Sequence, residues 1–401
     1  MFMNICFFSD LHISQQRGGV EKVSFVLSEA FKKRGHNVIM LSALEPIRGD
    51  ILLPNQFILP DKPTCSEKNI LFAKKIFKEK RIDIIINQSE TLSTYNLLKK
   101  SRESIPLITC LHTSPEAILK DVDDNWDLWK YNIGTIGYYT LYPYVFLRKK
   151  IQQYFRSKYI KEKFSKLYTE SDAIVLLSEK YINLFQNIVK IRNHEKIFVI
   201  HNPETRDASK NNVEGVEKEN IILYVGRLVL HPKRIDRLLR IWSKIKQKGD
   251  WRLIIVGDGP DKKTLMSLNA KLRNRNIEFV GTQEPTLFYK KAKILCLTST
   301  YEGSPCVIRE AKSHNTIPIS FDSFESVTDY ITNGTNGFII NAFDLKQYAQ
   351  TLSRLMHDKN LLNKIQNNIA QEFDNNDFQN EKIIKNWETL FKELHKLNNT
   401  N

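Results

Sequence analysis

The sequence predicts an α/β protein built from two parallel β-sheets, each covered by helices on both faces. Short, nearly continuous apolar runs alternate with amphipathic segments of helical length along the whole chain. A polar stretch without periodicity, which contains DASKNNVEGVEKEN, interrupts this alternation once, and the alternation then resumes. The most economical interpretation is two Rossmann-like, doubly wound halves joined by a linker.

The expected strands follow from the apolar runs. In the first half these runs are Asn4–Phe8, Asn37–Leu41, Ile82–Ile86, Leu107–Leu111, Ala173–Leu177 and Lys196–Ile200. In the second half they are Ile221–Val225, Trp251–Val256, Glu278–Val280, Lys293–Leu297, Ile317–Ser320 and Gly337–Ile340. The division that follows is an N-terminal domain over 1–201, a linker over 202–219, a C-terminal domain over 220–375, and a final helix over 376–401 that packs back on the N-terminal domain.

Composition restricts the class of protein. The chain has 401 residues, of which 41% are hydrophobic and 26% charged, as in soluble globular proteins. No apolar run reaches the length of about eighteen residues that a membrane span needs. Met1–Asp10 lacks the basic start of a signal peptide and reads as a strand. Five scattered cysteines without metal-type spacing indicate a reduced, cytoplasmic setting.

The charge is strongly positive, with a formal net value of +15 and a sequence pI near 9.4. Such a balance favours an anionic partner, although lysine-rich solvated faces produce the same value. One segment, Tyr138–Lys166, concentrates eight Lys and Arg residues from Arg148 onward against Glu162 alone, with aromatic residues interleaved. This pattern favours a helix that lies on an anionic membrane surface. A half-buried helix with basic side chains along its edges is the alternative.

Two glutamates stand on either side of an expected helix start in the stretch YEGSPCVIRE. Ser304 and Pro305 are typical of an N-cap and a first helical residue. Because a strand precedes them, Ser304–Val307 should lie at the carboxyl edge of a sheet, where backbone amides favour phosphate. Glu302 and Glu310 would repel phosphate but accept hydrogen bonds from sugar hydroxyls. The stretch therefore predicts a nucleoside diphosphate sugar site, with a purely structural helix start as the alternative.

Two cations follow the first strand of the second half. Ile221–Val225 leads into Gly226-Arg227, and Lys233 follows in the next loop. Arg227 offers a planar fork and Lys233 a point charge, and both suit a diphosphate. The alternative is two solvated cations in a very basic protein.

Three further motifs follow expected strands. Gly18 and Gly19 open a helix after the first strand and let a ligand approach backbone amides. His112 ends an apolar strand, a position at which a single histidine is more often structural. Val256–Pro260 forms a tight turn but lacks the third glycine of GxGxxG, so it is a weak dinucleotide signal.

In this order, the glycine pair, the strand-end histidine, the Arg–Lys pair and the Glu-x7-Glu motif resemble the GT-B glycosyltransferases of family 4. This retaining family includes bacterial lipopolysaccharide, capsule and phosphatidylinositol mannosyl enzymes. The resemblance is strongest over Ile221–Phe338 and covers nearly the whole chain in outline. It implies a GT-B fold with an interdomain cleft, and the transfer of a hexosyl group from a nucleoside diphosphate sugar. A UDP-sugar is the leading candidate for this donor. The acceptor would be a glycan or a lipid-linked saccharide, in cytoplasmic or peripheral membrane synthesis of cell-surface polysaccharide.

The resemblance also assigns roles to residues. His112 would lie near the donor sugar's hydroxyls and the reaction centre. Arg227 and Lys233 would hold the diphosphate, with Arg234 a rival for the lysine's role. Glu302 would bind the transferred sugar and Glu310 the ribose diol. Donor contacts, mostly through the backbone, would come from Gly18, Gly19, Gly281, Gln283, Ser304, Cys306 and Val307.

We expect neither a metal nor a resident cofactor, because cations and helix amides can stabilise the charge on the leaving diphosphate. One motif argues for a metal: Asp121-Val122-Asp123-Asp124 contains the DxD of the other large glycosyltransferase fold. It follows a segment of helical pattern instead of a strand, so we interpret it as a polar loop. A nucleotide-sugar epimerase, which can share the fold, remains an alternative function. A nucleic-acid-binding protein is another, prompted by the net charge and by the Tyr138–Lys166 segment, but no helix-turn-helix, zinc module or RNP motif is present.

Overall fold

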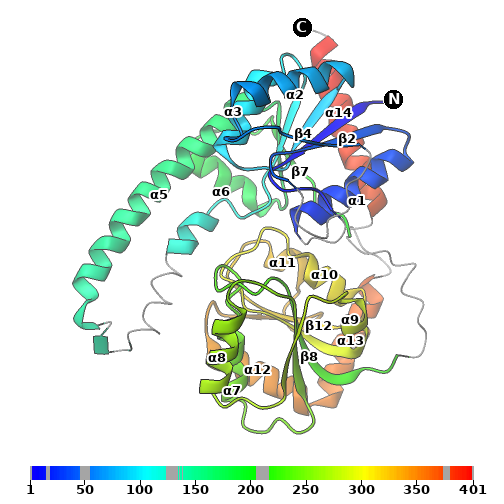
Figure 1. Ribbon diagram of the computed structural model, residues 1–401. Helices are drawn as coiled ribbons and strands as arrows, with labels where there is room; N and C mark the ends of the chain where they lie inside the picture. The colour runs from blue at the N-terminus through cyan, green and yellow to red at the C-terminus, as the bar shows by residue number, and fades with distance from the viewer. Residues whose placement is uncertain are drawn as a thin grey trace. The chain divides into compact units, whose positions relative to one another are not determined.

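The computed structural model describes residues 2–14, 19–45, 55–122, 134, 136–137, 139–204, 216–373 and 380–399. The described residues form two parallel sheets with helices packed against them (Figure 1). The chain divides into two compact units, one of Met1–Pro115, Ser157–Thr205 and Asp377–Asn401, the other of Glu116–Arg156 and Arg206–Asn376. Residues 116–156 therefore group with the second unit, whereas the division by sequence assigned them to the first domain.

The sheet of the first unit is parallel throughout and has the strand order β3-β2-β1-β4-β5-β6-β7. Its strands are β1 (Asn4–Ser9), β2 (Asn37–Ser42), β3 (Gln56–Ile58), β4 (Ile84–Asn87), β5 (Leu107–Cys110), β6 (Ala173–Leu176) and β7 (Ile197–Val199). The six expected strands lie within two residues of those observed. β3 was not predicted, because it is a three-residue edge strand that pairs only with β2.

Helices pack against this sheet along their apolar stripes. They are α1 (Val20–Lys33), α2 (Glu67–Glu79), α3 (Leu92–Ser101), the C-terminal part of α5 (Tyr142–Glu170), α6 (Lys180–Val189) and α14 (Asn380–Asn399). Hydroxyl caps start two of them: Ser66 accepts a hydrogen bond from the Asn69 amide in α2, and Thr91 accepts one from the Thr94 amide in α3. The C-terminal helix α14 packs on α1, with the Phe391 ring edge-on to Phe31 at 5.3 Å between ring centroids.

The sheet of the second unit is also parallel and has the order β10-β9-β8-β11-β12-β13. Its strands are β8 (Glu219–Val225), β9 (Arg252–Val256), β10 (Ile277–Gly281), β11 (Ala292–Leu297), β12 (Ile317–Phe321) and β13 (Phe338–Ile340). Its helices are α7 (Ile235–Lys244), α8 (Lys262–Lys271), α9 (Thr286–Lys291), α10 (Cys306–Lys312), α11 (Val327–Tyr330), α12 (Leu345–His357) and α13 (Lys359–Phe373). All six strands had been predicted from their apolar runs.

Each sheet has one topological switch point, where the strand order reverses. In the first sheet it lies between β1 and β4, and in the second between β8 and β11. Ligands of open α/β sheets bind outside the carboxyl ends of the strands at such points. Among the described residues, no helix combines the length and hydrophobicity needed to cross a bilayer.

Glycine shapes the second switch point. The backbone of Gly257, which follows β9, has φ +134°, and a Cβ there would lie 2.0 Å from the carbonyl oxygen of Gly226. Only glycine therefore lets the loops after β8 and β9 pack against each other at this distance. The consequence is a fixed course for the loop that carries Arg227.

Candidate active site

In the second unit an ion pair occupies the switch point. Lys233 Nζ donates to both carboxylate oxygens of Glu302, at 2.7 and 2.9 Å. The hydroxyl of Ser299 donates to the same carboxylate at 2.6 Å. The Glu302 side chain is only 12% exposed, compared with 29% for Lys233, so the carboxylate lies beneath the ammonium group.

Two loops are bonded together to form this pair. Lys233 lies in the loop after β8, and Glu302 in the loop after the neighbouring strand β11. The Thr300 amide donates to the carbonyl of Pro232 at 2.8 Å, and the Thr298 hydroxyl to the carbonyl of Arg234 at 3.0 Å. Cation and carboxylate are therefore positioned by the sheet and not by their own pairing alone.

The structure distinguishes Lys233 from Arg234, the alternative candidate for the same role. The Arg234 side chain is fully buried and is paired with Asp236 through its Nε at 2.9 Å and its Nη2 at 3.1 Å. Its guanidinium is thus part of the interior, while Lys233 and the exposed Arg227 remain accessible. Of the three cations, Arg227 and Lys233 are the two that an anionic ligand can reach.

Glu310 lies on α10 and is 95% buried. The phenol of Tyr289 donates to its carboxylate at 3.0 Å, and its main-chain carbonyl contacts Nδ1 of His314 at 2.7 Å. Tyr289 had not been predicted as a site residue, since its position in α9 gives no local signal.

The start of α10 differs from the prediction by one residue. Pro305 is the N-cap and Cys306 the first helical residue, so the prediction of Ser304 as the cap was wrong. The Ser304 hydroxyl instead forms a hydrogen bond with the phenol of Tyr330, which draws it away from the helix amides. Cys306 and Val307 are partly exposed.

Gly281 and Gln283, two of the predicted donor contacts, lie at the end of β10 and in the turn after it. Gly281 has φ +74° and its carbonyl accepts the Gly257 amide at 2.8 Å, so this turn is bonded to the loop after β9. Gln283 is exposed. The turn is separated by β9 from β8, the strand that leads to Arg227, and lies at the same edge of the sheet.

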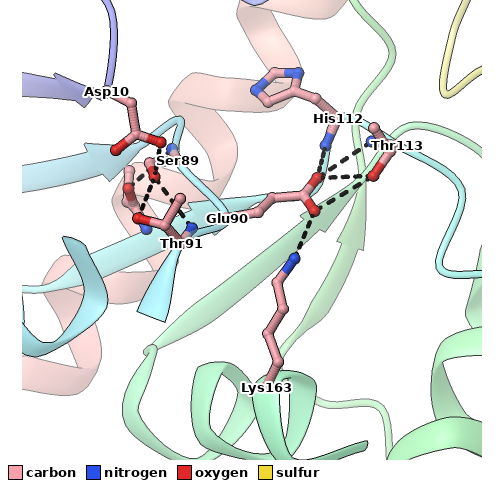
Figure 2. Close-up of polar contacts among 8 residues, drawn as sticks. Asp10, Ser89, Glu90, Thr91, His112, Thr113 and Lys163 are labelled. Atoms are coloured by element: carbon pink, nitrogen blue, oxygen red, sulfur yellow. Dashed lines mark hydrogen bonds and ion pairs between the residues drawn. The ribbon is translucent and has the colours of Figure 1, made fainter. Parts of the chain in front are cut away.

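In the first unit, Gly19 is the N-cap of α1 with φ 67° and ψ −133°, and a Cβ there would meet no atom within 4 Å. The described residues therefore leave the space beside its backbone open. Gly18 lies outside the described residues. At the first switch point, Asp10 after β1 accepts a hydrogen bond at 2.5 Å from the hydroxyl of Ser89, in the loop after β4 (Figure 2). It accepts another at 2.7 Å from the hydroxyl of Thr94 on α3.

His112 lies two residues beyond β5. Its Nε2 contacts Oε1 of Gln88, which follows the neighbouring strand β4. Desolvation by burial lowers the pKa of His112 to about 4, and the negative charge of Glu90 acts in the opposite direction. The imidazole is therefore neutral at physiological pH, so that one ring nitrogen donates a hydrogen bond and the other accepts one.

Glu90 organises this strand end, although it was not among the predicted site residues. Its carboxylate accepts the amides of His112 and Thr113, the Thr113 hydroxyl and the ammonium of Lys163 (Figure 2). The strand register brings the two residues together: Asn87 of β4 pairs with Thr109 of β5, and Glu90 and His112 each lie three residues beyond this pair. Sequence alone does not reveal that register.

The DxD segment has no strand before it. Residues 117–122 are helical, and Asp121 Oδ1 lies 3.7 Å from Nδ1 of His231. Asp123 and Asp124 lie outside the described residues. No group of three or more metal-ligating side chains is found in the described part of the chain.

Two Rossmann-like halves with open parallel sheets, one after the other in the chain, are the architecture of GT-B proteins. The model of the glycosyltransferase family 4 matches residues 17–203, and that of the glycosyl transferases group 1 matches residues 205–372. The chain belongs to the family 4 glycosyltransferases of the GT-B fold.

Individual relatives agree with this assignment. The chain is similar to an uncharacterized glycosyltransferase of Haemophilus influenzae, with 30% identity over 55% of this chain and 62% of the relative, less than two thirds of that relative's length. It is 24% identical, over 94% of this chain and 90% of the relative, to an α-1,4-N-acetyl-D-galactosaminyltransferase of Campylobacter jejuni whose name includes a PP-undecaprenol-linked saccharide. HepE of Anabaena, solved with UDP and glucose, shares the fold, with a TM-score of 0.70 and 14% identity over 98% of this chain and all of HepE.

Proposed function

We propose that the protein is a retaining hexosyltransferase. It transfers a sugar from a nucleoside diphosphate sugar to a glycan or lipid-linked acceptor in cell-surface polysaccharide synthesis. A UDP-sugar is the leading candidate for the donor, and the transfer requires no metal. Its family supports glycosyl transfer, and the names of its relatives support a lipid-linked saccharide acceptor and a uridine nucleotide.

One observation carries the proposal: a lysine–glutamate pair with an exposed arginine nearby in sequence, at the switch point of the second sheet. Diphosphate needs cations, and sugar hydroxyls need acceptors, and this site offers both side by side.

The mechanism assigns a step to each group. As the bond from the anomeric carbon to the diphosphate breaks, negative charge grows on the leaving phosphate, and Arg227 and Lys233 stabilise it. Glu302 orients Lys233 and accepts a hydroxyl of the transferred sugar. Glu310 accepts hydrogen bonds from the two ribose hydroxyls, and the neutral His112 forms a hydrogen bond with the donor sugar. Retention comes from attack on the face that the leaving group vacates.

Calorimetric titration of UDP, GDP and ADP without metal tests the donor site. One nucleotide should bind, and Glu310→Ala should weaken it about tenfold, a loss near 1.4 kcal/mol. Glu219→Ala is the matched control, because Glu219 pairs with Arg252 and Lys291 at the opposite, amino end of β8. If no nucleotide binds, or if both variants bind alike, the donor site is assigned incorrectly.

Product analysis separates transfer from epimerisation. An epimerase converts its nucleotide sugar with no acceptor present, whereas the proposed enzyme needs an acceptor to form a new glycoside. Measuring transfer with a chelator, and again after adding manganese, tests metal independence. Loss of activity with the chelator and its return with manganese would contradict the metal-free mechanism.

Peripheral membrane association is the second part of the proposal. The first half of α5 is exposed on nearly all sides, and its apolar side chains are in water: Tyr154 is 65% exposed, Phe155 63% and Leu147 61%. Between Tyr139 and Lys161 the chain has no acidic residue and carries six Lys and Arg. Exposed aromatic and basic groups on one helix suit an anionic lipid surface, where rings enter the interface and cations meet headgroups. The segment expected to do this was Tyr138–Lys166, of which Tyr138 lies outside the described residues.

Liposome flotation tests this part. The protein should float with vesicles containing anionic lipid and remain behind with neutral ones, and Tyr154→Ser/Phe155→Ser should reduce recovery. Thr389→Ser on α14 serves as a control away from α5. Equal recovery with neutral and anionic vesicles would exclude the electrostatic contribution. Steep, salt-sensitive binding to oligonucleotides instead would favour the nucleic-acid alternative.

A further inference from the structure

We propose, on the basis of the function proposed above, that Glu90 is a positioning residue of the transferase. Its carboxylate holds the main chain of His112 and Thr113 in the conformation that presents the His112 imidazole to the sugar, and Lys163 of α5 holds the carboxylate. Neither Glu90 nor Lys163 touches substrate in this proposal.

The sheet brings Glu90 to His112. Strands β4 and β5 are parallel neighbours, and Glu90 and His112 lie at the same level beyond their last paired residues. Glu90 Oε1 accepts the His112 amide at 2.8 Å and the Thr113 amide at 3.2 Å. One side chain therefore satisfies two main-chain donors that the ended strand leaves without sheet partners.

The remaining capacity of the carboxylate is used within the same cluster. The Thr113 hydroxyl lies 3.2 Å from Oε1 and 3.3 Å from Oε2, and Lys163 Nζ lies 3.1 Å from Oε2. An ionised carboxylate has about four lone-pair sites, and these contacts occupy both oxygens. The Glu90 carboxylate therefore bonds two main-chain amides, a hydroxyl and an ammonium group of the chain itself.

Glu90 acts on His112 through the backbone and not through the ring. Figure 2 shows the imidazole pointing away from the carboxylate, while the His112 amide points toward it. The ring is oriented separately by Gln88, two residues before Glu90. The loop after β4 therefore determines both where the histidine stands and how its ring is turned.

Lys163 makes this arrangement dependent on α5. The Lys163 side chain is only 7% exposed and that of Glu90 18%, so the pair is largely shielded from water. Charge-assisted hydrogen bonds are shorter and stronger than neutral ones, so the lysine holds the carboxylate in place. Helix α5 thus carries exposed aromatic and basic side chains in its first half. Its second half contacts Glu90, in the loop after β4, through Lys163.

The test compares carboxylates that are each bonded to a lysine in the same unit. Glu90→Gln keeps the size and removes the charge, and we expect kcat to fall about tenfold to hundredfold while KM for the donor changes little, because misplacement of a reacting group acts on the chemical step. Glu170→Gln is the control: Glu170 bonds Lys99 at 2.6 Å but precedes β6, at the amino edge of the sheet. Its kcat should equal that of the unaltered protein.

A second readout does not require turnover. With the histidines labelled with nitrogen-15, the His112 amide resonance should shift in Glu90→Gln and remain in place in Glu170→Gln. Lys163→Met, which retains the two amide bonds, should lower kcat less than Glu90→Gln does. Should Glu90→Gln fail to fold, Glu90→Asp takes its place, since it withdraws the carboxylate by one methylene and keeps the charge.

Wild-type kcat in folded Glu90→Gln, or an unchanged His112 resonance, would overturn the positioning role while leaving the transferase proposal intact. A loss of kcat no larger than in Glu170→Gln would do the same. Absence of all transfer in the unaltered protein, with the amide shift present, would instead contradict the proposed function and keep the link between Glu90 and His112.

Discussion

The pair of Arg234 and Asp236 allows a direct test of which cation serves the ligand and which serves the fold. Both side chains are buried, at 0% and 4% exposed, and both guanidinium contacts to the carboxylate are hydrogen bonds. Removing one member leaves the other charged and buried. Arg234→Met should therefore destabilise the second unit by about 3–5 kcal/mol, while Arg234→Met/Asp236→Leu should cost far less, because neither charge remains.

The assay is thermal unfolding combined with nucleotide titration. For a unit of this size a loss of 1 kcal/mol lowers Tm by roughly 2–4 °C, so Arg234→Met should lower it by about 6–20 °C. At a temperature where the variant is folded, its affinity for the nucleotide should be nearly unchanged. Lys233→Met should show the reverse: a stability change under about 1 kcal/mol, as for a partly exposed pair, and weakened binding.

Two results would refute this reasoning. If Arg234→Met lost nucleotide affinity while its Tm stayed the same, the arginine would be the ligand cation, and the assignment of Lys233 would be wrong. If the double variant were as unstable as Arg234→Met alone, the cost would arise from lost packing and not from an unpaired buried charge.

Three further predictions concern His112, Gly257 and α5. His112 has a folded-state pKa of about 4, compared with 6.5 for an unperturbed histidine, so the unfolded chain binds more protons between these values. The stability that neutral His112 contributes is present above about pH 6.5 and is lost as pH falls toward 4, and His112→Asn should flatten that decline in pH-dependent unfolding. Gly257→Ala should lower both Tm and nucleotide affinity, since its Cβ would meet a backbone oxygen at 2.0 Å, whereas Gly249→Ala, at φ +53° with open space around it, should cost only about 1–2 kcal/mol. Vesicle binding through α5 should weaken in high salt, because its six cations between Tyr139 and Lys161 are screened; flotation unaffected by salt would contradict this.

Local pattern sufficed for most of the fold. Strands such as Ile84–Asn87 are buried on both faces and were visible as apolar runs. The edge strand β3 escaped prediction, since three partly buried residues next to a single partner carry no such signature. The helix start at Cys306 was misplaced by one residue, because Tyr330 draws away the hydroxyl that local preference would have used as a cap.

Chain order and residue chemistry alone determined that two parallel sheets follow one another and that cations and carboxylates stand at their strand ends. Tertiary structure alone decided which of those groups are accessible from solvent and which are buried. Lys233 and Arg234 are adjacent and chemically alike. Lys233 is nevertheless partly exposed and pairs with Glu302, whereas Arg234 is buried and pairs with Asp236. Glu90 and Lys163 are 73 residues apart, and only the pairing of β4 with β5 and the packing of α5 bring them to His112. Such roles depend on burial and on contacts between distant segments, which no local pattern of residues encodes.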